Sequence, residues 1–145
     1  MITSEEAELN PSDPFQGNVP SKGICVLLVE DDRAMRRYLE VLLERCGYDV
    51  ISAADGLEAM KILLNETVHV VITDAVMPKL NGYELSRFVR SHQPLSHLPI
   101  ILLSGSDQKD AGPGTAHVNA FLPKPVSTDA LLKCLDAQLN QEPER

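Results

Sequence analysis

The sequence predicts an α/β fold, in which a single doubly wound sheet of five parallel strands carries helices on both faces. Three observations predict it. Short apolar runs alternate with amphipathic segments, the arrangement that is typical of strand–helix–strand units. Most of the runs are almost entirely apolar, as expected for strands that are buried on both faces. Polar or charged residues follow directly after four of the runs, and side chains at strand ends typically form the ligand-binding edge of such a sheet.

The predicted strands are short runs rich in valine, isoleucine and leucine. They cover residues 24–29, 49–53, 68–73, 99–103 and 120–123. Glycine, proline or charged residues bound them, and their lengths are those of strands rather than helices.

Helical periodicity predicts four regular helices. The first follows Asp32, a residue type that commonly caps helices, and ends at Gly47. The others cover about 56–65, 83–92 and 128–140, where apolar residues recur at intervals of three and four. Together these helices are enough to cover both faces of the sheet.

A further helix is expected between the fourth and fifth strands, but the sequence there is unfavourable. Gly112-Pro113-Gly114 interrupts it, and inside a helix proline costs about 3 kcal/mol and glycine about 1 kcal/mol. We therefore predict that this fourth helix in chain order is short or irregular, starting near Pro113 and running to about Val118.

The alternating pattern occupies residues 23–140, which we expect to form one domain. A chain of 145 residues is long enough for one full core. Residues 1–22 are acidic, contain three prolines and lack periodicity, which predicts a flexible N-terminal tail or linker. Residues 141–145 are predicted to be a C-terminal tail.

Composition excludes several classes of function. The formal net charge of −8 disfavours direct binding of nucleic acid, because phosphate repels an acidic surface. No apolar run is long enough to insert into a membrane, and no signal peptide opens the chain. The cysteines Cys25, Cys46 and Cys134 fall at apolar positions, which favours buried thiols in a reducing compartment over metal or redox chemistry. We therefore expect a cytoplasmic protein.

The residues that follow the strands predict a phosphoryl-transfer site around Asp74. Carboxylates at one sheet edge need a cation among them, and Mg²⁺ prefers such oxygen ligands. Asp74 is then both a ligand and a candidate nucleophile, with Glu30 and Asp31 holding the metal. Lys124 can neutralise the incoming phosphoryl group and Ser104 can donate a hydrogen bond to it. Taken singly, each residue is more often a cap or a solvated side chain, but together they favour this chemistry.

With these residues in place, the chain resembles the receiver domain of two-component response regulators over residues 23–140. The matching residues are Val29-Glu30-Asp31-Asp32, the pattern Asp-x-x-Met-Pro-x-x-x-Gly over 74–82, Ser104, Phe121 and Lys124-Pro125. The resemblance implies a flavodoxin-like sheet with strand order 2-1-3-4-5. It also implies a cis Lys124–Pro125 bond, since X-Pro bonds tolerate cis at small cost.

The resemblance further implies that Asp74 accepts a phosphoryl group from a histidine kinase or a histidine phosphotransfer protein. Mg²⁺ is then held by the three acids together with the backbone carbonyl of Val76. The chain is in that case not an enzyme acting on other molecules, since it catalyses only its own phosphorylation and dephosphorylation. Ser104 and Phe121 are the implied switch toward a downstream protein target, while Val76 and Ser106 occupy the positions that tune the lifetime of the aspartyl phosphate.

Two other classes of protein fit these residues less well. A haloacid-dehalogenase-like phosphatase is disfavoured because the acids after the first strand lack an Asp-x-Asp nucleophile pair. A pseudo-receiver, a binding module that works without phosphorylation, is disfavoured because every expected site residue is present. A stand-alone regulator and the terminal receiver of a hybrid histidine kinase both fit the sequence, which names neither the kinase, the stimulus, the output nor the oligomeric state.

Overall fold

The computed structural model of the chain describes residues 20–105 and 117–140, which form a five-stranded parallel sheet of order β2-β1-β3-β4-β5. This confirms the predicted fold class and strand order. The strands are β1 (Cys25–Val29), β2 (Asp49–Ala53), β3 (Val70–Asp74), β4 (Ile100–Ser104) and β5 (Ala120–Pro123). Strands β3 and β4 end one residue later than predicted, so Asp74 and Ser104 are the last residues of these strands rather than the first residues after them.

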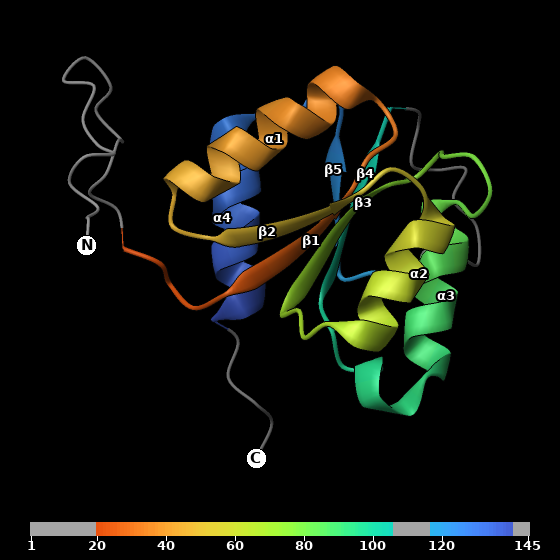
Figure 1. The fold of residues 1–145 in the computed structure, drawn as a ribbon. Coiled ribbons are helices and arrows are strands. Elements are labelled where there is room, and N and C mark those ends of the chain that lie inside the picture. The colour runs from red at the N-terminus through yellow and green to blue at the C-terminus, as the bar shows by residue number, and fades with distance from the viewer. Residues whose placement is uncertain (1–19, 106–116, 141–145) are drawn as a thin grey trace, which may run out of the picture.

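Helices cover both faces of the sheet. They are α1 (Arg33–Arg45), α2 (Gly56–Asn65), α3 (Gly82–Ser91) and α4 (Thr128–Leu139), with a short 3-10 helix at Gln93–Leu95. Helices α1 and α4 pack on one face, and α2 and α3 on the other (Figure 1). The predicted short helix between β4 and β5 falls mostly within residues 106–116, outside the described residues.

Each long helix begins at a polar side chain that caps it. The capping residues are Asp32, Asp55, Asn81 and Ser127, and each accepts a hydrogen bond from a backbone N–H of the first turn. Such caps satisfy donors that a helix start leaves without partners. The helix starts therefore follow from the sequence, within one residue of the predicted positions.

Alternating side chains of the strands feed two separate apolar clusters. In β1, Leu27 and Val29 pack toward α2 and α3, while Val26 and Leu28 pack toward α1 and α4. All four are fully buried. Because successive residues of a strand point to opposite faces, a strand buried on both sides has to be apolar at every position.

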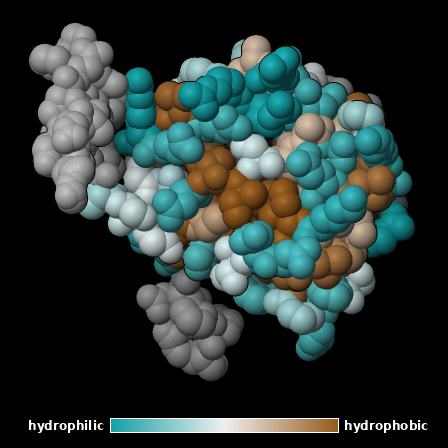
Figure 2. All heavy atoms as spheres, viewed as in Figure 1, coloured by the Kyte–Doolittle hydropathy of each residue, from teal (hydrophilic) through white to brown (hydrophobic). Residues whose placement is uncertain are grey.

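Strand β2 lies at one edge of the sheet and is less buried than its neighbours β1 and β3. It pairs only with β1, and three of its five residues are half-buried. Figure 2 shows apolar side chains gathered in the middle of this face, over β2 and toward α2. No strand covers the outer edge of β2 among the described residues, so its flanking side chains reach the surface.

The chain enters the domain beside the turn between α1 and β2. The N–H of Lys22 donates to the carbonyl of Gly47 at 2.9 Å, and the hydroxyl of Ser21 donates to Asp49 at 3.3 Å. Ser21 and Lys22, assigned from the sequence to the N-terminal tail, thus make contacts with the domain. The rest of the two predicted tails, 1–19 and 141–145, lies outside the described residues.

A hydrogen bond between β2 and α1 predicts a pH-dependent contribution to stability. The Ser52 hydroxyl donates to the Glu40 carboxylate and, with help from Arg37, holds the pKa of Glu40 below its ordinary value of 4.5. A lowered folded-state pKa gives stability that is present above the unfolded pKa and is lost as the pH falls through the folded pKa. We expect Ser52→Ala to lower the free energy of unfolding by about 1 kcal/mol at neutral pH.

Urea denaturation at neutral and acidic pH measures this. The difference in the free energy of unfolding between Ser52→Ala and the wild type should shrink at a pH where Glu40 is protonated in both proteins. Ser91 supplies the control, because its hydroxyl donates to the carbonyl of Phe88, which does not titrate. An equal loss at both pH values for Ser52→Ala would refute the assignment to Glu40.

Candidate functional site

The carboxyl ends of the strands bring four predicted residues to one edge of the sheet. Glu30 follows β1, Asp74 ends β3, Ser104 ends β4 and Lys124 follows β5. The register pairs Asp74 with Leu103, which places Ser104 one residue beyond that partner on the neighbouring strand. Parallel strands end at the same edge, so residues distant in sequence meet there.

Three carboxylates and one ammonium form the centre of the site. Glu30, Asp31 and Asp74 each offer an oxygen, and these oxygens lie within 4.8 Å of one another. The Nζ of Lys124 lies 3.0 Å from Oδ2 of Asp74 and 3.3 Å from Oε1 of Glu30. Lys124 therefore bridges two of the three acids, while the Asp31 side chain is exposed.

Burial shapes the charge state of this cluster. Glu30 is fully buried, and Asp74 is 5% exposed. Burial raises the pKa of Glu30, with the negative charge of Asp74 adding to the effect. Burial alone lowers the pKa of Lys124, but its hydrogen bond to Asp74 and the charges of both acids outweigh this, so the pKa of Lys124 is raised. Lys124 is consequently held as a cation.

The residues fit a divalent cation such as Mg²⁺. Oε1 of Glu30 is buried and makes no hydrogen bond to any described residue, although Lys124 lies within ion-pair distance. Buried polar atoms rarely lack a hydrogen bond without a reason. Mg²⁺ prefers carboxylate oxygens as ligands, and three of them cluster here. Asp31 is exposed, so the cluster can be reached from solvent. Glu30, Asp31 and Asp74 are thus the residues able to hold it.

Contacts with neighbouring residues hold the backbone at Asp74 in place. The hydroxyl of Thr73 donates to the carbonyl of Asp74 at 3.0 Å, and the N–H of Ala75 donates to Leu103 on β4 at 2.9 Å. Gly82, the first residue of α3, lies so close that an added Cβ would stand 2.3 Å from the Asp74 carbonyl oxygen. The start of α3 therefore closes against the strand end that carries Asp74.

The other predicted residues take the following positions. Ser104 is buried, and its carbonyl accepts from the N–H of Lys124 at 2.9 Å. Phe121 is half-buried in β5, opposite Leu102. The Lys124–Pro125 bond is cis, as the resemblance implied. Val76 is 73% exposed, whereas Ser106 lies outside the described residues.

A set of contacts that the sequence does not predict ties the loop after β3 to α2. Lys79 has a φ of +72° and its Nζ lies 3.5 Å from Oδ2 of Asp55, the cap of α2. The first residue of α2, Gly56, approaches the carbonyl of Leu80 so closely that a Cβ there would stand 2.2 Å from it. The only signal in the sequence is a glycine at the start of a helix, which by itself does not identify its neighbour.

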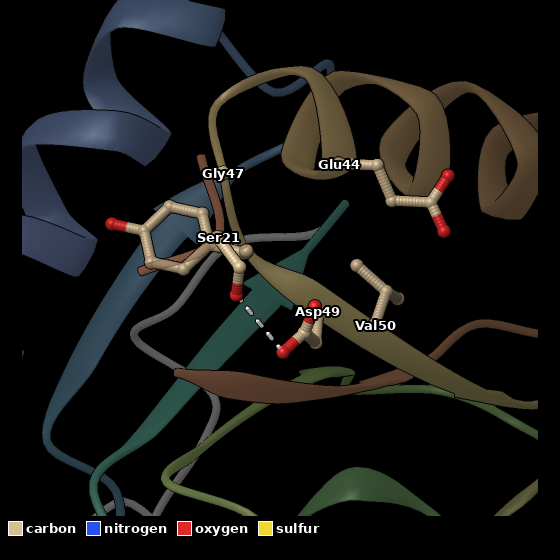
Figure 3. A pocket seen from close by; sticks show the side chains of 6 residues that line it. Ser21, Glu44, Gly47, Asp49 and Val50 are labelled. Carbon is tan, nitrogen blue, oxygen red and sulfur yellow. Dashed lines mark hydrogen bonds between the residues drawn. The ribbon is translucent and has the colours of Figure 1, made fainter. Parts of the chain in front are cut away.

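A second depression lies at the opposite, amino-terminal edge of the sheet. It has a volume of about 360 Å³ and is lined by Ser21, Glu44, Gly47, Tyr48, Asp49 and Val50. Figure 3 shows Ser21 reaching Asp49, with the Glu44 side chain directed away from this pair. The two acids do not converge, so this depression lacks the chemistry of the Asp74 edge.

Within the described ranges, no helix has the length and apolar character needed to cross a membrane.

Comparison with known proteins agrees with the geometry. A family model described as the response regulator receiver domain matches residues 26–136. Transcriptional regulatory protein GltR of Pseudomonas aeruginosa is 36% identical over 123 residues, covering 83% of this chain and 51% of GltR. Protein PilG of the same organism is 31% identical over 121 residues, covering 82% of this chain and 90% of PilG. The chain thus spans about half the length of the first relative.

Solved structures give the same result. The response regulator TrrA of Thermotoga maritima, in complex with Mg²⁺-BeF, is 25% identical with a TM-score of 0.74, covering 80% of this chain and 99% of TrrA. The region matched by the family model contains the whole sheet except Cys25, the first residue of β1, and it includes the strand ends that carry the acids and the lysine. The chain belongs to the response regulator receiver domains of two-component phosphorelay signalling.

Proposed function

We propose that Asp74 accepts a phosphoryl group from a phosphohistidine, in a Mg²⁺-dependent reaction, and that this transfer switches a protein-interaction surface. The observation that carries the proposal is the cluster of three carboxylates within 4.8 Å, bridged by Lys124. In the reaction, a carboxylate oxygen of Asp74 attacks phosphorus. The new P–O bond forms as the P–N bond to the donor imidazole breaks, and the imidazole nitrogen keeps the electron pair.

The residues around Asp74 have separate parts in this transfer. Mg²⁺, when bound by Glu30, Asp31 and Asp74, supplies positive charge that offsets the charge of the phosphoryl oxygens. Lys124, already 3.0 Å from Asp74, keeps a second positive charge beside the attacking carboxylate. In this proposal the Ser104 hydroxyl donates a hydrogen bond to a phosphoryl oxygen, which the position of Ser104 at the end of the adjacent strand supports. The backbone carbonyl of Val76 completes the proposed ligand set.

Receiver domains work with histidine kinases and downstream effectors, and we propose the same classes of partner here. A histidine kinase or histidine phosphotransfer protein supplies the phosphoryl group. Movement of Ser104 toward it frees space for half-buried Phe121 to turn inward, which biases a two-state surface toward a downstream protein. Phe121 has no hydroxyl to hold either position, so packing alone decides between them.

The test of this function is Mg²⁺-dependent labelling by a phosphoryl donor such as acetyl phosphate. Asp31→Ala should slow labelling about a hundredfold and abolish its dependence on Mg²⁺, because the metal loses its exposed ligand. Asp129→Ala is the control, since Asp129 is exposed on α4 and pairs only with Lys133 among the described residues. Equal labelling of the wild type in Mg²⁺ and in chelator would remove the metal from the proposal.

The residue two positions after Asp74 predicts a long-lived phosphorylated state. Val76 is 73% exposed beside the site and offers no side-chain hydrogen bond to an attacking water. We expect Val76→Asn combined with Ser106→Glu to hydrolyse its aspartyl phosphate about tenfold faster, because an amide and an acid can orient that water. Release of phosphate after removal of the donor measures the rate. An unchanged lifetime would show that water orientation at these positions does not limit hydrolysis.

A further inference from the structure

The backbone carbonyl of Glu30 is held by a side chain of α1 and not by a neighbouring strand. The Nη1 of Arg36 donates to this carbonyl at 2.8 Å. The backbone N–H of Glu30 still takes part in the sheet, because it donates to the carbonyl of Ala53 in β2 at 3.1 Å. Beyond Val29, the path of the chain is therefore set by Arg36 on one side and by β2 on the other.

This contact sits between two residues whose side chains are also fixed. Oε2 of Glu30 accepts from the N–H of Asp32 at 3.1 Å, and Oδ1 of Asp32 caps α1 through the N–H groups of Ala34 and Met35. Asp31 stands between them with an exposed carboxylate. Because peptide units are planar, fixing the Glu30 carbonyl fixes the N and Cα of Asp31, and the hydrogen bond from the Asp32 N–H restrains the peptide that follows. With both flanking peptides held, the direction of the Asp31 Cα–Cβ bond is set.

From these contacts we propose that Arg36 is a positioning residue for the cation site, acting through the Glu30–Asp31 peptide. The inference rests on the proposed function, because it concerns ligands for the same metal. Groups that orient metal ligands typically change metal affinity by 10- to 100-fold when they are removed. Arg36 is half-buried. The pKa of Glu40 is lowered mainly by the hydrogen bond from Ser52, and the charge of Arg36 contributes a smaller effect in the same direction. Among the described residues, the guanidinium makes its hydrogen bond to the Glu30 carbonyl, so its link to Glu40 is through charge alone.

A charge effect and a positioning effect of Arg36 have opposite signs. A guanidinium near the site repels a second cation, so loss of its charge alone would tighten Mg²⁺ binding. Loss of the hydrogen bond to the Glu30 carbonyl frees the peptide and weakens binding. The direction of the change therefore separates the two.

The test measures Mg²⁺ affinity by isothermal titration calorimetry. We expect Arg36→Met to weaken Mg²⁺ binding about tenfold. Arg37→Met is the matched control, because Arg37 is the next residue, is 71% exposed and pairs with Glu40 at 3.2 Å. It should bind Mg²⁺ as the wild type does. In metal-free protein, the amide resonances of Asp31 and Asp32 should shift in Arg36→Met and stay in place in Arg37→Met.

A second variant guards against loss of the fold. Arg36→Lys keeps the charge and a single donor, so we expect an affinity between those of Arg36→Met and the wild type, with a thermal midpoint close to wild type. Wild-type affinity in Arg36→Lys and Arg36→Met, or tighter binding in Arg36→Met, would overturn the inference. If Asp31→Ala also bound Mg²⁺ normally, the proposed metal site itself would fail, which is a distinguishable result.

Discussion

Asp74→Asn should take up no acid-labile phosphate from acetyl phosphate or from a phosphorylated histidine donor. An amide is a poor nucleophile toward phosphorus and a weaker ligand for Mg²⁺ than a carboxylate. The variant should nevertheless remain folded, because the change removes a negative charge from beside buried Glu30, whose pKa Asp74 helps to raise. Intact-protein mass spectrometry after incubation with the donor measures the added phosphoryl group.

The control for this experiment is Asp49→Asn. Asp49 is exposed at the amino-terminal edge of the sheet, where it accepts from Ser21, so its loss should leave labelling unchanged. Labelling of Asp74→Asn at the wild-type rate would place the acceptor elsewhere and contradict the proposed function. Labelling lost in both variants would indicate damage to the fold rather than to the acceptor.

Gly82→Ala should lower the free energy of unfolding by about 2 kcal/mol, a large effect for one methyl group. The added carbon would stand 2.3 Å from the carbonyl oxygen of Asp74, 2.8 Å from Leu102 Cδ1 and 3.1 Å from the Cα of Ala75. Two of these neighbours are backbone atoms, so the clash is relieved only by moving α3 or the end of β3. Either movement displaces Asp74, and we expect slower phosphorylation as well.

Gly105→Ala is the matched control for this glycine. Among the residues that the structure describes, its added carbon would meet only the Cδ of Lys124, at 3.8 Å, which is an ordinary van der Waals contact. Urea denaturation should therefore separate the two variants, with Gly105→Ala close to the wild type. Equal stability of Gly82→Ala and Gly105→Ala would show that the start of α3 yields without cost.

The strands and helices could be located from the sequence to within about two residues, because each depends on neighbouring residues. The run 49–53 and the segment 56–65 match β2 and α2 as they stand, since apolar periodicity and the Asp55 cap act locally. The meeting of Glu30, Asp74 and Lys124 also followed, because parallel strands share one carboxyl edge. Features that depend on the local sequence pattern were therefore predictable from the sequence alone.

The contacts that join separate segments could not be predicted in this way. The hydrogen bond from Arg36 to Glu30 depends on how α1 lies against β1, and several arginines in α1 looked equivalent. The positive φ of Lys79 has no local signal, since the residue types that favour it are glycine and asparagine. The proximity of Gly82 to Asp74 likewise requires the packed position of α3.

The division of the interior by the sheet also allows the two helical layers to diverge independently in evolution. Leu27 and Leu28 are neighbours in β1, yet each packs into a different apolar cluster. Substitutions in clusters that share no side-chain contacts have effects that add, so a change in one layer needs no compensation in the other. A lineage can therefore reshape the α2 and α3 layer for a new partner while α1 and α4 keep β1, and the acids that follow it, in place.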